Sequence, residues 1–87
     1  MKATPYEEWR ISEIKKNGQL FALYGVFQLW ICKETVYSFR ADHTGYALWC
    51  PHSMLARHLR NLYRVTGKRF EEWQDVCIIR PELLPTY

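Results

Sequence analysis

Residues 20–50 read LFALYGVFQLWICKETVYSFRADHTGYALWC, a stretch rich in aromatic and β-branched residues. Such residues favour β-strands, and the polar segments Lys33-Glu34 and Ala41–Gly45 supply turns between them. We therefore predict an antiparallel meander whose three strands cover residues 20–32, 35–40 and 46–50. Gly25 leaves two alternatives for the first strand, because it fits a bulge in one long strand or a turn between two short ones.

The segments on either side of the meander carry helix signals. Thr4, Pro5 and Glu7 form the pattern of a helix start with a capping box. Asn17-Gly18 ends that helix, since glycine accepts the left-handed backbone that often follows a last turn. A second helix is predicted over residues 51–66, opened by Pro51 and ended by Gly67. The spacing of Phe70, Trp73 and Cys77 predicts a short third helix.

The expected fold is α+β, with the element order α-β-β-β-α-α in a single domain over residues 1–87. A chain of 87 residues can build one small core, and its 48% apolar and 24% charged residues are typical of a globular protein. The helix–meander–helix order resembles that of a double-stranded RNA-binding domain. That family has a lysine-rich start to its second helix, and this chain departs from it with Pro51-His52-Ser53-Met54.

The two turns predict a register, in which Trp30 pairs with Tyr37 and Tyr37 pairs with Trp49. Side chains alternate between the faces of a sheet, so this register defines two faces. The aliphatic face, expected to be core, holds Phe27, Leu29, Ile31, Val36, Ser38, Leu48 and Cys50. The other face holds Gln28, Trp30, Tyr37, Phe39, Ala47 and Trp49, and includes an aromatic row of Trp30, Tyr37 and Trp49.

Two interpretations of that row stay open. It packs beneath the first helix together with Tyr6 and Trp9, because monomers seldom leave large apolar patches bare. Alternatively it is an exposed docking surface for a partner protein or for unstacked bases.

The second predicted helix has a basic face opposite its apolar face. This face carries Arg57, Arg60 and Arg64, and Lys68 and Arg69 extend it. Several cations on one rigid face suit phosphate groups, since each neutralised phosphate releases counterions. The alternative is a solvated helix face, in which some arginines pair with the acidic residues Glu71, Glu72 and Asp75.

Three cysteines, with histidines near them in the sequence, are candidates for a metal or catalytic site. The odd count predicts free thiols in a reducing, cytoplasmic compartment, and neither a signal peptide nor a membrane-spanning run is expected. Cys32, His43, Cys50 and His52 lack the paired spacing of structural zinc sites, so no metal or cofactor is expected. Cys50 and His52 could form a nucleophile–base pair, but a buried structural thiol is favoured, and no enzyme motif points to catalysis.

The sequence therefore predicts a small non-enzymatic binding protein. Protein–protein interaction is the first choice, through Trp30, Tyr37, Phe39, Trp49 and the charged region after the meander, because aromatic residues and arginine dominate binding energy at interfaces. A short chain without cofactor motifs suits an inhibitor of a host system encoded by a phage or mobile element. The alternative is a nucleic-acid-binding module that uses Arg57, Arg60, Arg64, Lys68 and Arg69. Self-association through the aromatic face or an unpaired strand edge stays a further alternative.

Overall fold

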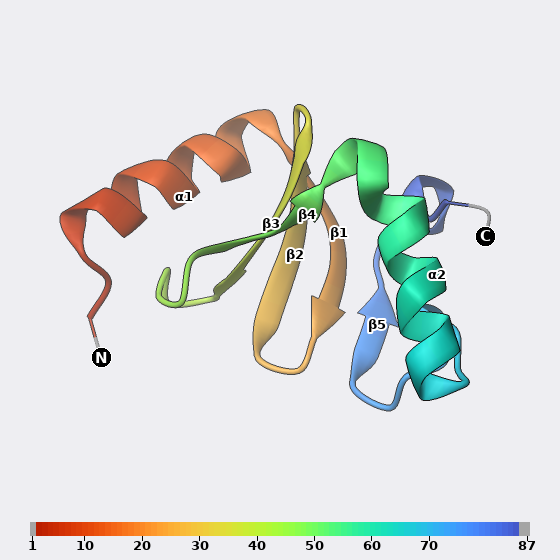
Figure 1. The fold of residues 1–87 in the computed structure, drawn as a ribbon. Helices are drawn as coiled ribbons and strands as arrows, with labels where there is room; N and C mark the ends of the chain where they lie inside the picture. The colour runs from red at the N-terminus through yellow and green to blue at the C-terminus, as the bar shows by residue number, and fades with distance from the viewer. Residues whose placement is uncertain (1, 86–87) are drawn as a thin grey trace.

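A computed structural model describes residues 2–85 and shows an α+β fold in which a five-stranded antiparallel sheet lies between two helices (Figure 1). The helices are α1 (Pro5–Asn17) and α2 (Leu55–Thr66), and the strands are β1 (Gln19–Tyr24), β2 (Phe27–Cys32), β3 (Thr35–Arg40), β4 (Ala47–Pro51) and β5 (Val76–Ile78). Short 3-10 helices cover His52–Met54, Phe70–Glu72 and Pro81–Leu83. The strand order is β4-β3-β2-β1-β5, so the last strand returns to the far edge of the meander.

The start of α1 is the predicted one. The Thr4 hydroxyl accepts a hydrogen bond from the Glu7 amide at 3.1 Å, and the Glu7 carboxylate accepts one from the Thr4 amide at 2.9 Å. The reason predicted for Gly18 is wrong, because its backbone is extended, with φ −111°. A Cβ there would lie 2.7 Å from the carbonyl oxygen of Ile31 and 2.8 Å from that of Ile14. Glycine therefore allows the end of α1 to approach β2 closely.

The first predicted strand is two strands, β1 and β2, joined by a turn at Gly25. Gly25 has a φ of +60°, which lies in the left-handed region, and its amide donates a hydrogen bond to the carbonyl of Asp75 at 2.9 Å. The meander consequently has four strands. This element order also departs from the helix–three strands–helix order on which the resemblance to double-stranded RNA-binding domains rests.

The predicted third helix is wrong. Residues Phe70–Glu72 make one 3-10 turn, and the segment Val76–Ile78 is then the strand β5. Ala22 pairs with Ile78 and Tyr24 with Val76, so the free edge of β1 recruits this segment. A single helical turn gains little by itself, whereas pairing with an existing sheet satisfies the backbone groups of β1. The second helix begins later than predicted, at Leu55, and ends as predicted at Gly67 with φ +75°.

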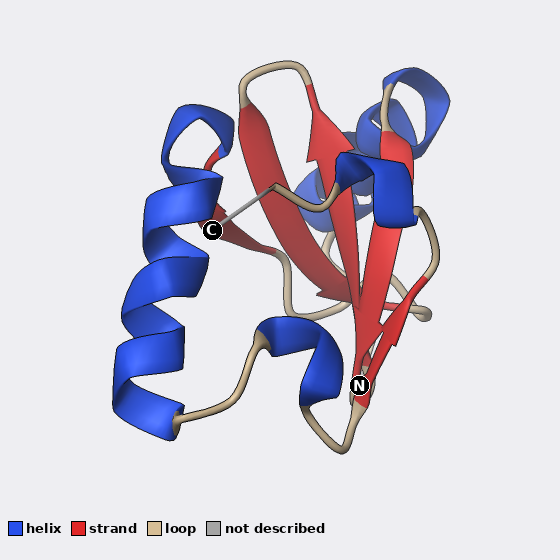
Figure 2. Ribbon diagram, turned by 90° about the vertical axis from the view of Figure 1, so that its right-hand side faces the viewer, coloured by secondary structure: helices blue, strands red, loops and turns tan. Residues whose placement is uncertain are grey.

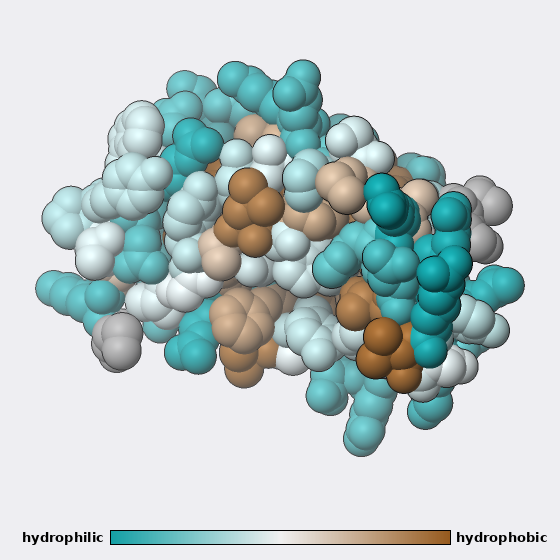
Figure 3. All heavy atoms as spheres, viewed as in Figure 1, coloured by the Kyte–Doolittle hydropathy of each residue, from teal (hydrophilic) through white to brown (hydrophobic). Residues whose placement is uncertain are grey.

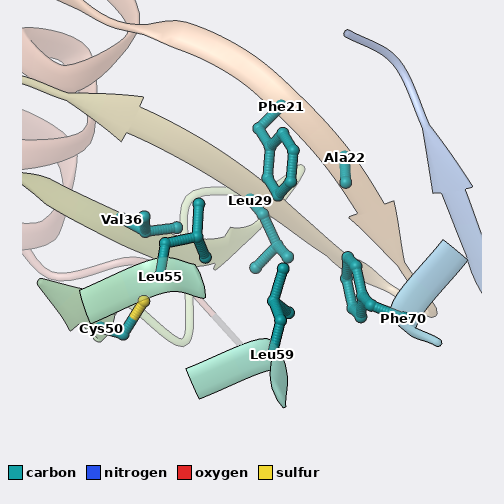
Figure 4. Packing of buried hydrophobic residues seen from close by; sticks show 8 residues of the cluster. All are labelled: Phe21, Ala22, Leu29, Val36, Cys50, Leu55, Leu59 and Phe70. Atoms are coloured by element: carbon teal, nitrogen blue, oxygen red, sulfur yellow. The ribbon is translucent and has the colours of Figure 1, made fainter. Parts of the chain in front are cut away.

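Each helix covers one face of the sheet, as Figures 1 and 2 show. Figure 4 shows Leu55 and Leu59 of α2 pointing toward the sheet; their buried cluster comprises Phe21, Ala22, Leu29, Val36, Cys50, Leu55, Leu59 and Phe70. On the opposite face, Ile11 and Ile14 of α1 pack on Tyr37 and Phe39, with Trp30, Cys32 and Tyr46 around them. Both faces of a small sheet are therefore core, and neither is left bare along the middle strands.

The register between β2 and β3 is the predicted one, with Trp30 opposite Tyr37 and Cys32 opposite Thr35. Between β3 and β4 it is wrong, because the pairing shifts between Val36, which faces Cys50, and Tyr37, which faces Leu48. Trp49 is the extra residue of this bulge. A bulge turns every following side chain to the other face, and as a result Leu48 and Ala47 lie on the faces opposite to those predicted.

Candidate functional site

The predicted aromatic row is not an exposed surface. Phe39 is 0% exposed and Tyr37 is 9% exposed, since both lie beneath α1. Trp30 is half-buried and stacks on Phe39 with ring centroids 6.2 Å apart, while its indole N–H donates to the Gln28 side chain at 2.8 Å. Trp49 belongs to the other face, where its ring contacts His58 at 4.8 Å and Phe70 at 5.6 Å. The first open interpretation, packing beneath the helix, describes Trp30 and Tyr37.

One group of aromatic side chains that reaches the surface lies on α1 and beside β4. We call Tyr6, Trp9, Tyr46 and Leu48 the aromatic patch. Tyr6 is 60%, Trp9 57% and Leu48 58% exposed, and Tyr46 is half-buried. The Tyr6 ring lies 6.2 Å from Trp9 and 6.3 Å from Tyr46, centroid to centroid. Leu48 pairs with Tyr37, whose ring stacks on Tyr46 at 5.7 Å, so the strand residue Leu48 lies opposite a neighbour of Tyr46.

Arg10 binds Tyr46 of this patch and the neighbouring Tyr37. Its Nε donates to the Tyr46 hydroxyl at 3.2 Å and its Nη2 donates to the Tyr37 hydroxyl at 3.1 Å. The guanidinium carbon also lies 5.6 Å from the centroid of the Tyr37 ring. The hydrogen bond to Tyr46 and the charge interactions with both hydroxyls raise the pKa of Arg10 above its ordinary value. The cation is therefore fixed in place and fixes Tyr46 in turn.

A groove of about 700 Å³ continues the patch along α1. Trp9, Arg10 and Glu13 form its helix side, and the β2–β3 turn around Lys33 and Glu34 forms the other. Beside it, β4 is an edge strand of the described sheet. The bulge in β4 and Pro51 interrupt regular pairing along this strand. Bulges and prolines on edge strands hinder the addition of another strand. Side chains rather than strand pairing therefore dominate what this surface offers.

The predicted basic surface is present on α2. Arg57, Arg60 and Arg64, which we call the arginine stripe, are all exposed, and none forms a salt bridge with a described residue. Figure 3 shows strongly hydrophilic side chains over this helix. Lys68 is exposed as well, and the backbone amide of exposed Arg69 donates to the Glu72 carboxylate at 3.3 Å. Among the described residues, Arg57, Arg60 and Arg64 therefore do not form the alternative pairing with Glu71, Glu72 or Asp75.

The cysteines and histidines lie apart. Cys50 is 5% exposed, and burial raises the pKa of its thiol to about 11. His43 lies between Glu8 and Lys15 of α1, with its two ring nitrogens 2.9 Å from the Glu8 carboxylate and from the Lys15 ammonium. Within residues 2–85, no three His, Cys, Asp or Glu side chains gather as ligands for one metal ion. In the same part of the chain, no helix has both the length and the apolar character needed to cross a bilayer.

Sequence reasoning missed the aromatic patch. One of the two open interpretations packs Tyr6 and Trp9 against the sheet, but the two buried residues of α1 are Ile11 and Ile14. The helix is only weakly amphipathic, so its pattern could not reveal which side packs on the sheet.

Comparison with protein-family models, curated proteins and solved structures finds no match to this chain.

Proposed function

We propose that this protein is a non-enzymatic binding module that docks onto another protein through the aromatic patch. The observation that carries the proposal is the exposure of Tyr6 and Trp9 on a helix that buries Ile11 and Ile14. These two large rings contribute little to the core, and a folded monomer gains nothing from holding them in water. A partner that covers them would remove that cost, since burial of apolar surface drives association.

The residue types of the patch fit such a role. Trp, Tyr and Arg are enriched among the few residues that dominate binding energy at interfaces. Tyr46 is held by Arg10, and Tyr6 packs edge-on against Tyr46. Side chains that are already ordered lose less entropy on binding, so more of the contact energy appears as affinity. The groove beside Trp9 offers space for a side chain of the partner next to the patch.

The mode of action that follows is occlusion. A domain of this size that docks without altering its partner acts by covering a surface that the partner needs. Inhibitors of host systems encoded by phages and mobile elements act in this way, and we extend the proposal to that class. The aromatic patch, with Tyr46 held by Arg10, supports it.

Site-specific photo-crosslinking tests the proposal in cells that carry the gene. A benzophenone amino acid replaces Leu48 in the patch, and in a control it replaces Val65 on α2, which is 84% exposed. We expect a crosslink from position 48 to one other protein, lost when Trp9→Ala is added, and no such crosslink from position 65. A crosslink that survives Trp9→Ala, or one that forms equally from position 65, contradicts the proposal. Crosslinks only between copies of this chain would show that the patch is a self-association surface instead.

A further inference from the structure

The arginine stripe has the geometry of a phosphate-binding track. Its residues follow one another at three and four positions along α2, which at 1.5 Å per residue places them about 4.5 and 6 Å apart along the helix axis. All three point away from the apolar side of the helix, where Leu55 and Leu59 are buried. A guanidinium binds phosphate oxygens through two parallel hydrogen bonds, which a lysine cannot do. Three guanidinium groups without a salt-bridge partner among residues 2–85 are thus aligned along the helix.

The charge around the stripe is one-sided. Residues 51–70 contain five of the 12 Lys and Arg residues of the chain and none of its nine Asp and Glu residues. The nearest acids in sequence, Glu71 and Glu72, follow in the 3-10 turn. Positive charge is thus concentrated in one segment, although the net charge of the whole chain is small. Such a segment suits a partner that carries negative charge along its length.

A second feature lies at the C-terminal end of α2. Tyr24, Thr66, Lys68, Trp73 and Gln74 line an open hollow of about 480 Å³, which we call the aromatic hollow. The rings of Tyr24 and Trp73 lie 5.6 Å apart at 60°, and Phe70 supports Trp73 from the core at 5.4 Å. The Trp73 N–H donates to the carbonyl of Lys68 at 3.3 Å, which fixes the indole at the wall of the hollow. Lys68 thus belongs to both the basic segment and the hollow.

We propose that α2 and the aromatic hollow bind single-stranded nucleic acid, with phosphates on the arginine stripe and a base stacked on Trp73. Single-strand binders combine a basic track with aromatic rings that stack on bases. An acidic protein would match the charge of the stripe, but its carboxylates supply no planar base to stack on the rings of the hollow beside it. A duplex would match the stripe as well, but its bases are already stacked. This site lies on the face of the sheet opposite the aromatic patch, and it is independent of the protein-binding proposal.

The stripe is tested by fluorescence anisotropy with a labelled single strand at two salt concentrations. The variant carries Arg57→Gln, Arg60→Gln and Arg64→Gln. The control carries Lys2→Gln, Lys16→Gln and Lys33→Gln, three exposed residues elsewhere, so both proteins lose the same net charge. We expect the stripe variant to bind at least about tenfold more weakly than the parent, while the affinity of the control stays within about threefold of it. The slope of the logarithm of the binding constant against the logarithm of the salt concentration should be smaller by about 2 in the stripe variant. Equal losses in both variants, or no binding by the parent at low salt, would overturn the proposal.

The aromatic hollow is tested by quenching of tryptophan fluorescence. We expect the single strand to quench the parent protein and a Trp9→Phe control, and to quench a Trp73→Phe variant much less. A conservative change of indole to phenyl keeps the ring contact with Phe70, and circular dichroism checks the fold of every variant. Undiminished quenching in Trp73→Phe overturns the proposed stacking. Equal affinity for a duplex of the same sequence, or equally effective competition by polyglutamate, would assign the stripe to a duplex or to an acidic protein instead.

Discussion

The Nε of Arg10 donates a hydrogen bond to the hydroxyl of Tyr46 at 3.2 Å, and this contact joins α1 to the segment that enters β4. The same guanidinium reaches Tyr37 on β3, so one side chain connects the helix to two parts of the sheet. Because Tyr6 packs on Tyr46, the arrangement of the aromatic patch depends on Arg10.

Replacing Arg10 therefore tests how the patch is held. Arg10→Ala removes two hydrogen bonds and a cation–π contact, and we expect a loss of about 1–2 kcal/mol in the free energy of unfolding. Arg10→Lys should recover only part of this loss, since an ammonium cannot reproduce the fork of the guanidinium. Urea denaturation followed by circular dichroism measures both. Arg57→Ala, on the exposed stripe, is the control and should change stability by less than about 0.5 kcal/mol.

The capping box of α1 gives a second prediction. Thr4→Ala should cost about 1 kcal/mol of stability, the usual effect of removing a helix cap. The backbone hydrogen bond from Thr4 lowers the pKa of Glu7 below its ordinary value of 4.5. A carboxyl with a lowered pKa in the folded state stabilises the protein above its unfolded pKa, and loses that effect as the pH falls through the folded pKa.

Stability measured from neutral pH down into the acid range checks this linkage. Glu7→Gln should show a shallower acid loss than the parent protein, because the titrating group is gone. Glu82→Gln, at an exposed site in the short 3-10 helix Pro81–Leu83, provides the comparison. An unchanged acid slope in Glu7→Gln would show that the capping box contributes nothing to the pH dependence.

Gly18 and Gly67 separate close packing from backbone conformation. Gly18→Ala places a Cβ less than 3 Å from two carbonyl oxygens, and we expect a loss of about 2–3 kcal/mol as α1 and β2 move apart. Gly67→Ala has open space around it but a φ of +75°, so only the left-handed backbone is penalised, by about 1 kcal/mol. Chemical denaturation of the two variants measures the difference. Equal losses would contradict the tight approach at Gly18.

The thiol of Cys50 gives a prediction at high pH. Burial raises its pKa from 9.0 to about 11, so the folded state keeps the proton over a range in which the unfolded chain releases it. The contribution of this thiol to the free energy of unfolding is fully present below pH 9 and is lost as the pH rises from 9 to 11. Cys50→Ala should flatten that decline. With a thiol reagent near neutral pH, exposed Cys77 should react readily, and Cys50 only after unfolding.

Local signals in the sequence predicted local structure well. The capping box at Thr4 and Glu7, the Lys33-Glu34 turn and the helix end at Gly67 each depend on a few neighbouring residues, and each is confirmed. The pairing of Trp30 with Tyr37 follows from that short turn. The arginine stripe was predicted for the same reason, since helical spacing alone places its three residues on one face.

Features that depend on distant partners could not be predicted. The bulge at Trp49 adds one residue to β4, and nothing in the alternation of apolar residues marks it. The strand β5 forms because β1 offers an open edge, which the sequence around Val76 does not reveal. The exposure of Tyr6 and Trp9 depends on which side of α1 meets the sheet. The aromatic patch was therefore outside the reach of sequence reasoning, although its residue types were conspicuous.

If the aromatic patch binds a protein partner, the dissociation constant of the complex must depend on the side chains of the patch. The partner identified by crosslinking is purified without the crosslink and titrated by isothermal titration calorimetry. The parent protein is compared with Trp9→Ala and with Tyr63→Ala, a change at an exposed aromatic residue on α2. We predict that Trp9→Ala weakens binding by about 30-fold or more, equivalent to about 2 kcal/mol, while Tyr63→Ala stays within about threefold. Equal affinities of the partner for the parent protein and for Trp9→Ala would contradict docking through the aromatic patch.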